Sequence, residues 1–346
     1  MLSVKIEKWN TLKEKINNLY IDNRFLTIYQ SWDYLNSTGK GFTARHPMNM
    51  LGLKEKNYTL YNDDQLIAVA PLLIKRRHGK NFIYLRGTFT GAGNLDFIYS
   101  DTISFDDFSF FIDTISKMEV SAAWKIERIS EKSLLCNYWK QYIAEKKGII
   151  SSDICVEIPV PSKYDDWYAG LSKSTRQNIR TAYNRLKTDN KKLNVELYYD
   201  TKIPKKIFNE ILKVSSMRAL EYMKIKSKML WSIINILKKR EPVMSFLRKY
   251  THCFYGIVRI DGKISAFLAG FEVNDGRIII PKLSYNSAFY RYSPGTVLIN
   301  ETMNNICTKD DILSLDLSRG DEKYKSTFGG IEYLNYSFEF NGNSDY

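Results

Sequence analysis

The sequence has 346 residues, of which 44% are hydrophobic and 26% are charged, and its formal net charge is +13. The length and apolar content suit one large or two ordinary globular domains, and the positive charge suits either a solvated basic surface or a polyanionic partner. No stretch reaches the roughly 18 unbroken apolar residues of a membrane span, and the N-terminal residues lack the apolar core of a secretion signal, so the sequence predicts neither kind of segment.

The first half of the chain predicts a three-stranded meander. Its segments are NYTLY, LIAVAPLLIKRR and FIYLR within residues 57–86, separated by short polar turns. A glycine loop with Gly91 and Gly93 follows, and then a helix over 106–118, a strand over 123–129 and a further helix. This order of elements is typical of a mixed sheet flanked by helices.

The second half repeats this order with little residue identity. We expect strands at 253–260, 264–273 and 277–285, a turn at 293–295, a helix at 296–306 and a strand at 312–317. Asp261-Gly262 and Asp275-Gly276 favour tight hairpins, because glycine supplies the positive φ that such turns need. Two common meanders can also resemble each other by chance. In either case the fold class is α/β or α+β, with mixed, mostly antiparallel sheets.

Between the halves lies a predicted helical insert. Ser172 suits the N-cap of a helix over 172–187. Arg176 and Arg180 lie in a basic stripe on this helix, which either binds an acceptor phosphate or is a solvated face. Two more helical stretches cover 204–220 and 226–240. We place the boundary near residue 160, within a strand, which gives domains 1–160 and 161–346.

A strand, loop and helix in the second half predict a phosphate site. The free N–H groups and the dipole at a helix start attract anions. Ser293 is expected to cap the helix, and Pro294 suits its first turn. Gly295 lets a phosphate approach the backbone beside Thr296, and Arg291 adds a charge-assisted contact. The alternative is an ordinary capped turn.

A polar cluster follows the last expected strand of the second half. The segment SRGDEKYKSTFGG brings together Asp316, Arg319, Asp321, Glu322 and Lys325. Open α/β sheets bind ligands at the carboxyl ends of their strands. The segment therefore predicts a ligand site, with a salt-bridged turn as the alternative.

Several segments of the chain together resemble one family. They are TIYQSWDYL, LIAVAPLLIKRR, GLSKSTRQNIR, KISAFLAGF, YSPGTVLI and DLSRGDEKYKSTFGG. Over residues 25–340 the chain resembles the GNAT-like acyltransferases of the CelD-like family, which occur in polysaccharide loci. The resemblance implies two tandem GNAT domains that share an acceptor groove, with the acceptor side in the N-terminal half and the acyl-CoA site in the C-terminal half.

The segment YKSTFG is similar to the F-K-x-G-F-G segment of the more distant Fem peptidyltransferases. In those enzymes the lysine contacts the donor near its reacting carbonyl, which implies the same role for Lys325. Tyr324 and Thr327 replace the first Phe and first Gly, and the long coiled-coil insert is lacking. These departures favour acyl-CoA over aminoacyl-tRNA as donor, although a tRNA partner stays an alternative.

The expected reaction is the attack of an amine on a thioester carbonyl, which needs near-attack geometry and a stabilised oxyanion. Backbone groups near Leu283 and Tyr285 suit the donor, and Pro281, which lacks an N–H, indicates a bulge. Lys325 is the candidate cation. The acceptor is expected to be an amino sugar, free or linked to a nucleotide or lipid.

Four carboxylates are candidate bases: Asp96, Asp316, Asp321 and Glu322. Asp96 follows the glycine loop of the first half, where relatives place an acidic residue. In many GNAT enzymes a water takes the place of a single dominant base. The scattered cysteines and histidines predict reduced thiols, a cytoplasmic protein and no metal site. A Fem-like transferase and a non-catalytic module of a synthase complex stay as alternative functions.

Overall fold

The computed structural model describes residues 1–346 except 24, 39–51, 78, 146–147, 225–229, 231–232, 235, 239–240, 274, 321 and 341–346. It divides into two compact units. Unit 1 is Met1–Ile154 with Tyr333–Tyr346, and unit 2 is Cys155–Glu332. The division falls in the same strand as the boundary expected near residue 160. The C-terminal residues, which the sequence placed in the second half, belong to unit 1.

Unit 1 is built on a mixed sheet with the strand order β1-β2-β3-β4-β6-β13, and β5 pairs with β3. Strands β1 to β4 are antiparallel neighbours, β4 and β6 are parallel, and β13 is antiparallel to β6. The strands are β1 (Leu2–Glu7), β2 (Leu53–Asn62), β3 (Gln65–Arg77), β4 (Lys80–Leu85), β5 (Ile98–Tyr99), β6 (Ala122–Ser130) and β13 (Ile331–Phe340). The helices are α1 (Lys13–Asp22), α2 (Trp32–Thr38), α3 (Phe105–Met118) and α4 (Leu134–Glu145).

The strands of unit 2 lie in the order β7-β12-β11-β10-β9-β8, and β7 contributes its residues from Cys155 onward. Strands β8 to β11 are antiparallel neighbours, β11 and β12 are parallel, and β7 is antiparallel to β12. The strands are β7 (Ile149–Pro159), β8 (Leu193–Tyr198), β9 (Cys253–Ile260), β10 (Lys263–Glu272), β11 (Arg277–Tyr285) and β12 (Ser314–Arg319). The helices are α5 (Tyr164–Gly170), α6 (Lys173–Thr188), α7 (Lys205–Tyr222), α9 (Pro242–Leu247), α10 (Pro294–Ile306) and α11 (Lys323–Thr327).

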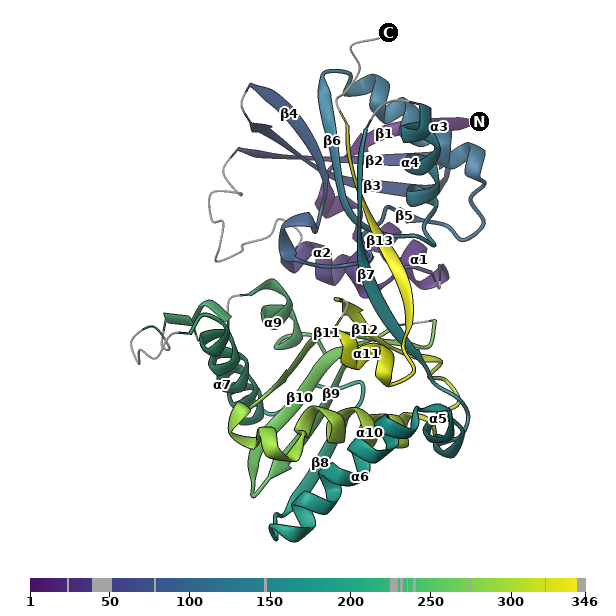
Figure 1. The fold of residues 1–346 in the computed structure, drawn as a ribbon. Helices are drawn as coiled ribbons and strands as arrows, with labels where there is room; N and C mark the ends of the chain where they lie inside the picture. The colour runs from purple at the N-terminus through teal and green to yellow at the C-terminus, as the bar shows by residue number, and fades with distance from the viewer. Residues whose placement is uncertain are drawn as a thin grey trace. The chain divides into compact units, whose positions relative to one another are not determined.

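The two units repeat one topology (Figure 1). Three antiparallel strands are followed by a helix and by a strand parallel to the third: β2-β3-β4-α3-β6 in unit 1 and β9-β10-β11-α10-β12 in unit 2. A helix between two parallel neighbours is the usual connection, because parallel strands cannot be joined by a tight turn. The repeat in element order predicted from the sequence is therefore confirmed.

Each sheet receives its last strand from the other part of the chain. Strand β7 follows the helices of unit 1 but pairs with β12, and β13 follows α11 but pairs with β6. In unit 1 the ring of Phe340 lies 4.3 Å from that of Trp139 and 6.5 Å from that of Trp124. Burial of these aromatic side chains is worth several kcal/mol, at roughly 25 cal/mol per Å² of apolar surface, and it fixes β13 in unit 1.

One tight turn and one helix cap read from the sequence form as expected. In the β9–β10 hairpin, Asp261 and Gly262 have φ values of 49° and 76°. Two positive φ values are those of a type I′ turn, whose twist matches the flanking strands. At the start of α6, the Ser172 hydroxyl accepts a hydrogen bond of 3.1 Å from the Thr175 amide. Both predictions are confirmed.

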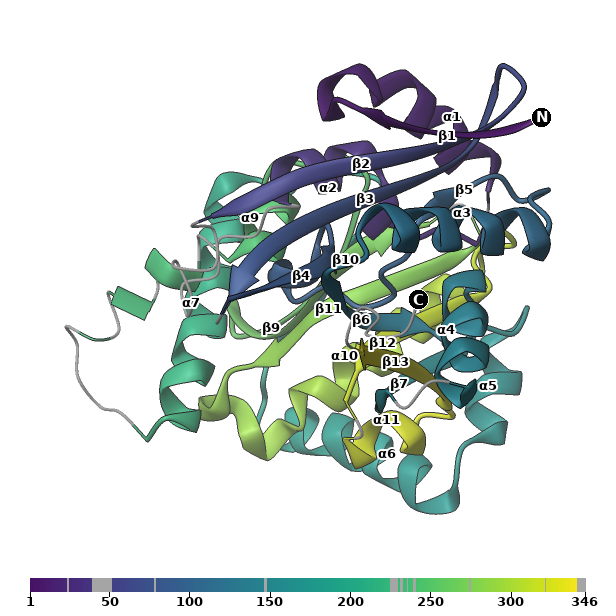
Figure 2. The ribbon, with the colours of Figure 1, turned by 90° about the horizontal axis from the view of Figure 1, so that it is seen from above.

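The sheet of unit 2 carries helices on both faces (Figure 2). Alternate residues of a strand point to opposite faces. Phe254 and Val258 of β9 belong to the core with α5, α6 and α10. Tyr255 points the other way, and its hydroxyl donates to the Leu247 carbonyl of α9 at 2.8 Å. Helix α7 contacts β10 and β11, and the Phe246 ring of α9 lies 5.6 Å from that of Phe271 of β10.

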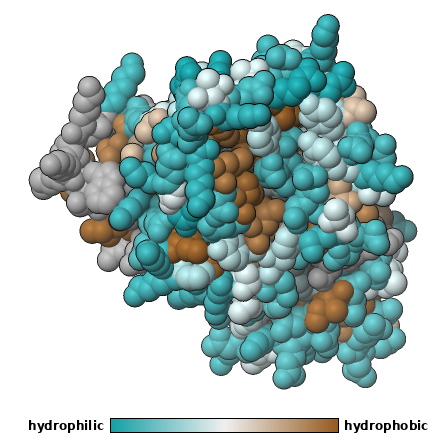
Figure 3. Space-filling view, turned by 90° about the horizontal axis from the view of Figure 1, so that it is seen from below, coloured by the Kyte–Doolittle hydropathy of each residue, from teal (hydrophilic) through white to brown (hydrophobic). Residues whose placement is uncertain are grey.

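On the face shown in Figure 3, polar side chains surround small separate patches of hydrophobic ones. Among the described residues, no helix combines the length and apolar character needed to cross a bilayer. The four cysteines are buried free thiols. The described ranges contain no group of three or more acidic, cysteine or histidine side chains placed to hold a metal ion.

Candidate functional site

Strands β11 and β12 run together over only part of their length. Their parallel pairing covers Arg277 to Ile279 of β11, and the last pair is Ile279 with Asp316. Strand β11 continues to Tyr285, and its later residues pair only with β10 within the described chain. The edge of β11 near Leu283 and Tyr285 therefore offers backbone N–H and C=O groups to an extended ligand.

A bulge marks the point where β11 leaves β12. The register with β10 shifts by one residue between the pairs Phe271–Ile279 and Ala269–Lys282. Two residues of β11 thus stand opposite Gly270 alone, where a Cβ atom would lie only 2.0 Å from the Ile279 carbonyl oxygen. A bulge of this kind bends its strand and ends regular pairing. The bulge predicted at Pro281 is confirmed.

Helix α10 begins just beyond β11 with an open backbone amide. Ser293 is the N-cap residue, with φ 47° and ψ 56°, but its hydroxyl makes no capping bond, so the expected side-chain cap is wrong. Its carbonyl instead accepts from the amides of Thr296 at 2.9 Å and Val297 at 3.2 Å. Pro294 begins the helix as predicted. Among the described residues the Gly295 amide has no acceptor, and a Cβ there would meet nothing within 4 Å.

The equivalent helix of unit 1 begins differently. The Ser104 hydroxyl caps α3 by accepting a 3.0 Å hydrogen bond from the Asp107 amide, and Asp106 and Asp107 place two negative charges in the first turn. Helix α10 has no acidic residue in its first turn. Of these two equivalent helices, α10 is therefore the one whose start attracts a phosphate group, because the partial positive charge of α3 is already neutralised.

The exposed side chain of Arg291 binds helix α6. Its Nε lies 2.8 Å from Oδ2 of Asp189, and the Tyr292 hydroxyl donates to the same oxygen at 3.0 Å. The hydrogen bonds from Arg291 and Tyr292 lower the pKa of Asp189. Arg185 of α6 in turn donates to the Arg291 carbonyl at 2.9 Å. These contacts fix the loop before α10, and a phosphate contact of Arg291 stays a prediction.

Lys325 is only 2% exposed and is surrounded by oxygen atoms. Its Nζ donates to the carbonyls of Ser318 at 3.2 Å, Arg319 at 2.9 Å and Gly320 at 3.1 Å. It also lies 2.9 Å from a carboxylate oxygen of Glu322. The positive φ values of Ser318 (57°) and Gly320 (122°) curl the end of β12 so that the carbonyls converge. All three protons of the ammonium group are therefore engaged by the protein itself.

The remaining acidic candidates of unit 2 differ in their surroundings. Asp316 is fully buried, and its Oδ1 accepts a 2.7 Å hydrogen bond from the Ser318 amide. This bond supports the bulge between Asp316 and Arg319 in the β12–β7 pairing. Glu322 is the ion-pair partner of Lys325. Asp321 lies outside the described residues.

Asp96 lies in unit 1, after the loop that contains the left-handed Gly91. Its carboxylate is partly buried and accepts hydrogen bonds from the Phe97 amide at 2.8 Å and the Tyr99 hydroxyl at 3.1 Å. Burial raises the pKa of Asp96 to about 7, against the lowering effect of hydrogen bonds from Ser133, Phe97 and Tyr99. A carboxyl group that titrates near neutral pH is suited to proton transfer.

The two candidate acceptor arginines on α6 have different surroundings. Arg176 donates to the carbonyls of Ala169 at 2.6 Å and Leu171 at 2.9 Å, and so satisfies the C-terminal end of α5. Arg180 is exposed and donates to Gln177 at 3.0 Å. The side chain of Arg176 is thus hydrogen-bonded within unit 2, whereas that of Arg180 is accessible to a ligand.

Sequence reasoning missed one charged pair beside the bulge. Lys282 of β11 forms an ion pair with Glu241, which precedes α9, and Lys238 lies 3.3 Å from the same carboxylate. Burial lowers the pKa of Lys282. The signal was a lysine in the middle of a largely apolar strand, because a charge at such a position needs a partner.

Known proteins share the fold of this chain. Residues 246–326 match the family model described as an acetyltransferase (GNAT) domain. No curated protein matches the chain. A conserved protein of unknown function from Bacteroides thetaiotaomicron is 11% identical over 98% of this chain and 99% of that chain, with a TM-score of 0.54. A tandem GNAT protein from the clavulanic acid biosynthesis pathway is 6% identical over 100% of both chains, with a TM-score of 0.51. FemX is 10% identical over 98% and 97%, with a TM-score of 0.51.

At these identities the similarity concerns the fold. The match to the GNAT domain runs from α9 to α11 and includes the bulge of β11, the start of α10 and Lys325. The expected fold class is confirmed: the chain has the fold of a tandem GNAT protein.

Proposed function

We propose that the protein is an N-acyltransferase that moves an acyl group from acyl-CoA, acetyl-CoA or a longer thioester, to an amine, and that unit 2 binds the donor. The diphosphate of coenzyme A binds at the start of α10, where the amide of Gly295 is open, and Thr296 lines the same turn. The pantetheine arm lies along the unpaired edge of β11 at Leu283 and Tyr285. The difference between the neutralised start of α3 and the open start of α10 carries this proposal.

The chemistry follows from this placement. The nitrogen lone pair of the amine attacks the thioester carbonyl, a C–N bond forms, the C–S bond breaks, and the thiolate leaves and takes up a proton. Backbone N–H groups beside the bulge suit the developing oxyanion. Lys325 acts as a positioning residue, because its protons hold the end of β12. Asp96 stays a candidate base, because burial raises the pKa of its carboxyl group to about 7.

The acceptor we propose is an amino sugar, free or linked to a nucleotide or lipid, in polysaccharide biosynthesis. The resemblance to the CelD-like family supports this class, and exposed Arg180 is available for a phosphate of the acceptor. A Fem-like transferase that uses aminoacyl-tRNA is the second candidate, which the similarity to FemX and the net charge of +13 favour. Binding of total tRNA at low salt, with affinity that falls steeply as salt rises, would support the second candidate.

A single substitution tests the donor site. Gly295→Ala adds a Cβ atom where the folded protein has open space but where the diphosphate is proposed to lie. We expect unchanged thermal stability and a loss of coenzyme A affinity of about tenfold or more, measured by isothermal titration calorimetry. Gly170→Ala is the matched control, since a Cβ there also meets nothing within 4 Å. Equal affinity of the two variants, or no binding by the wild-type protein, would refute the proposed site.

A further inference from the structure

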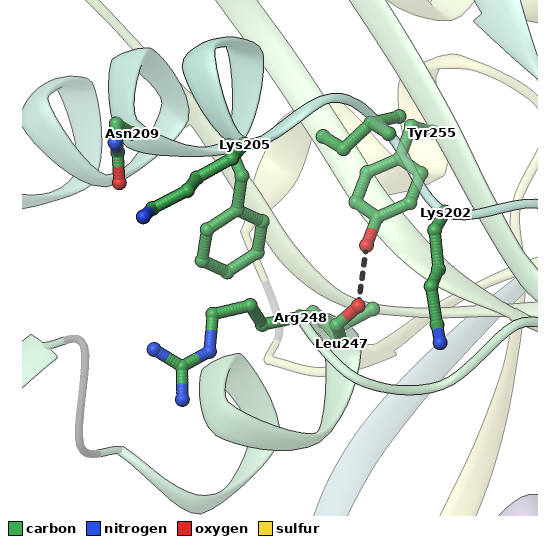
Figure 4. A pocket seen from close by; sticks show the side chains of 8 residues that line it. Lys202, Lys205, Asn209, Leu247, Arg248 and Tyr255 are labelled. Carbon is green, nitrogen blue, oxygen red and sulfur yellow. Dashed lines mark hydrogen bonds between the residues drawn. The ribbon is translucent and has the colours of Figure 1, made fainter.

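Unit 2 contains a pocket of about 340 Å³ that lies between the start of α7, the end of α9 and strand β9. Four buried side chains form its apolar floor: Ile203, Phe208, Leu247 and Tyr255. The hydroxyl of Tyr255 donates to the Leu247 carbonyl at 2.8 Å, as the dashed line in Figure 4 shows. The floor therefore presents carbon surface, including aromatic rings, with its polar atoms already paired. The volume lies in the lower range of small-molecule sites.

The rim of this pocket is basic. Lys202, Lys205 and Arg248 line it together with the amide side chain of Asn209, and all four are exposed. Figure 4 shows Lys205 and Arg248 extending to one side of the pocket, with Lys202 on the other side. No acidic residue lines the pocket. Three cations without a carboxylate among the lining residues create a positive potential over an apolar floor.

The acidic residues closest in the chain have other partners. Asp200 is hydrogen-bonded to the ring of His252, and Glu210 lies 2.7 Å from Arg259. Among the described residues, none of the three rim cations has an ion-pair partner within 4.0 Å. The charge of the rim is therefore available to a ligand.

The pocket is separate from the proposed donor site. Tyr255 of β9 pairs with Ala269 of β10, and Ala269 pairs with Lys282 of β11, so the pocket lies two strands from the bulge, about 10 Å away at the usual strand spacing. It also lies on the face of the sheet that carries α7 and α9, whereas α10 packs with the core of the opposite face. A ligand can occupy the pocket while the start of α10 stays free.

We propose that this pocket binds an organic phosphate, with the phosphate group between Lys205 and Arg248 and the organic part on the apolar floor. An ammonium and a guanidinium group are suited to a phosphate, because both donate charge-assisted hydrogen bonds to its oxygen atoms. The floor adds affinity in proportion to the apolar surface of the ligand that it covers. An inorganic anion uses only the rim, and a neutral aromatic molecule uses only the floor.

The test titrates the intact chain with phenyl phosphate as the probe and measures binding by calorimetry. Inorganic phosphate and phenol are titrated separately in the same way. We expect saturable binding of phenyl phosphate that is at least fivefold tighter than that of either fragment. Lys205→Gln and Arg248→Gln should each weaken it at least fivefold. Lys206→Gln is the control, since this neighbouring lysine is exposed but does not line the pocket. Unchanged binding by this control supports the site.

Three results would overturn the proposal. Equal weakening in all three variants would mean that general surface charge binds the anion. Equal affinity for phenyl phosphate and inorganic phosphate would mean that the floor contributes nothing. Displacement of coenzyme A by phenyl phosphate would place the probe in the donor site instead. The phenyl phosphate test measures binding of a probe and does not depend on coenzyme A. A negative result in this test therefore leaves the Gly295 experiment valid, and a negative result in the Gly295 experiment leaves the phenyl phosphate test valid.

Discussion

Replacing Lys325 with methionine separates two roles for this side chain. The ammonium group donates to three carbonyls at 2.9–3.2 Å and is 2% exposed. Methionine keeps most of the apolar stem of the side chain but leaves these carbonyls without a donor. A lost hydrogen bond of this kind costs about 1 kcal/mol or more, so we expect Lys325→Met to lower the free energy of unfolding by about 3 kcal/mol. We assign no stabilising energy to the ion pair with Glu322, because the side chain of Glu322 is 57% exposed and solvent screens the interaction.

Denaturant unfolding followed by tryptophan fluorescence measures this loss. The indole of Trp167 donates to the Phe328 carbonyl at 3.0 Å, so one fluorophore lies next to the affected loop. For a unit of this size, the expected decrease in melting temperature is roughly 6–12 °C. Lys323→Met is the control, because this exposed lysine of α11 should change stability by less than about 0.5 kcal/mol. If Lys325→Met lowers the transfer rate but unfolds like the wild-type protein, the positioning role is wrong and a free catalytic cation is favoured.

Two further predictions concern the bulge and unit 1. Gly270→Ala should lower the free energy of unfolding by about 3 kcal/mol or more and abolish coenzyme A binding, because its Cβ would lie 2.0 Å from the Ile279 carbonyl oxygen. A stable variant with normal affinity would contradict the role of the bulge. Asp96→Asn should change how stability depends on pH. The folded protein keeps the Asp96 proton up to pH about 7, whereas the unfolded chain releases it near pH 4. Between these pH values the wild-type protein should therefore lose stability relative to the variant as pH rises, by at most about 4 kcal/mol. Chemical unfolding of both proteins at pH 4.5 and 7.5 measures this difference. Parallel curves for the two proteins would show that the carboxyl is not buried in this way.

The repeat of element order and its local signals could be predicted from the sequence alone. Asp261-Gly262 forms the expected tight turn, Ser172 caps α6, and Pro281 marks the bulge. These features depend on the conformational preferences of a few adjacent residues, so distant parts of the chain do not alter them. The same holds for Pro294 at the start of α10.

Contacts between distant residues decided the rest. Strand β13 joins the strands of unit 1, where aromatic side chains such as Phe340 are buried, and no local pattern reports this. Arg291 is paired with Asp189, 102 residues away, and the protons of Lys325 are engaged because β12 curls at its end. The sequence determined which residue types stand near each site. Only the tertiary structure decided which of their hydrogen-bonding groups stay available to a ligand, because backbone and side-chain partners compete for them across the fold.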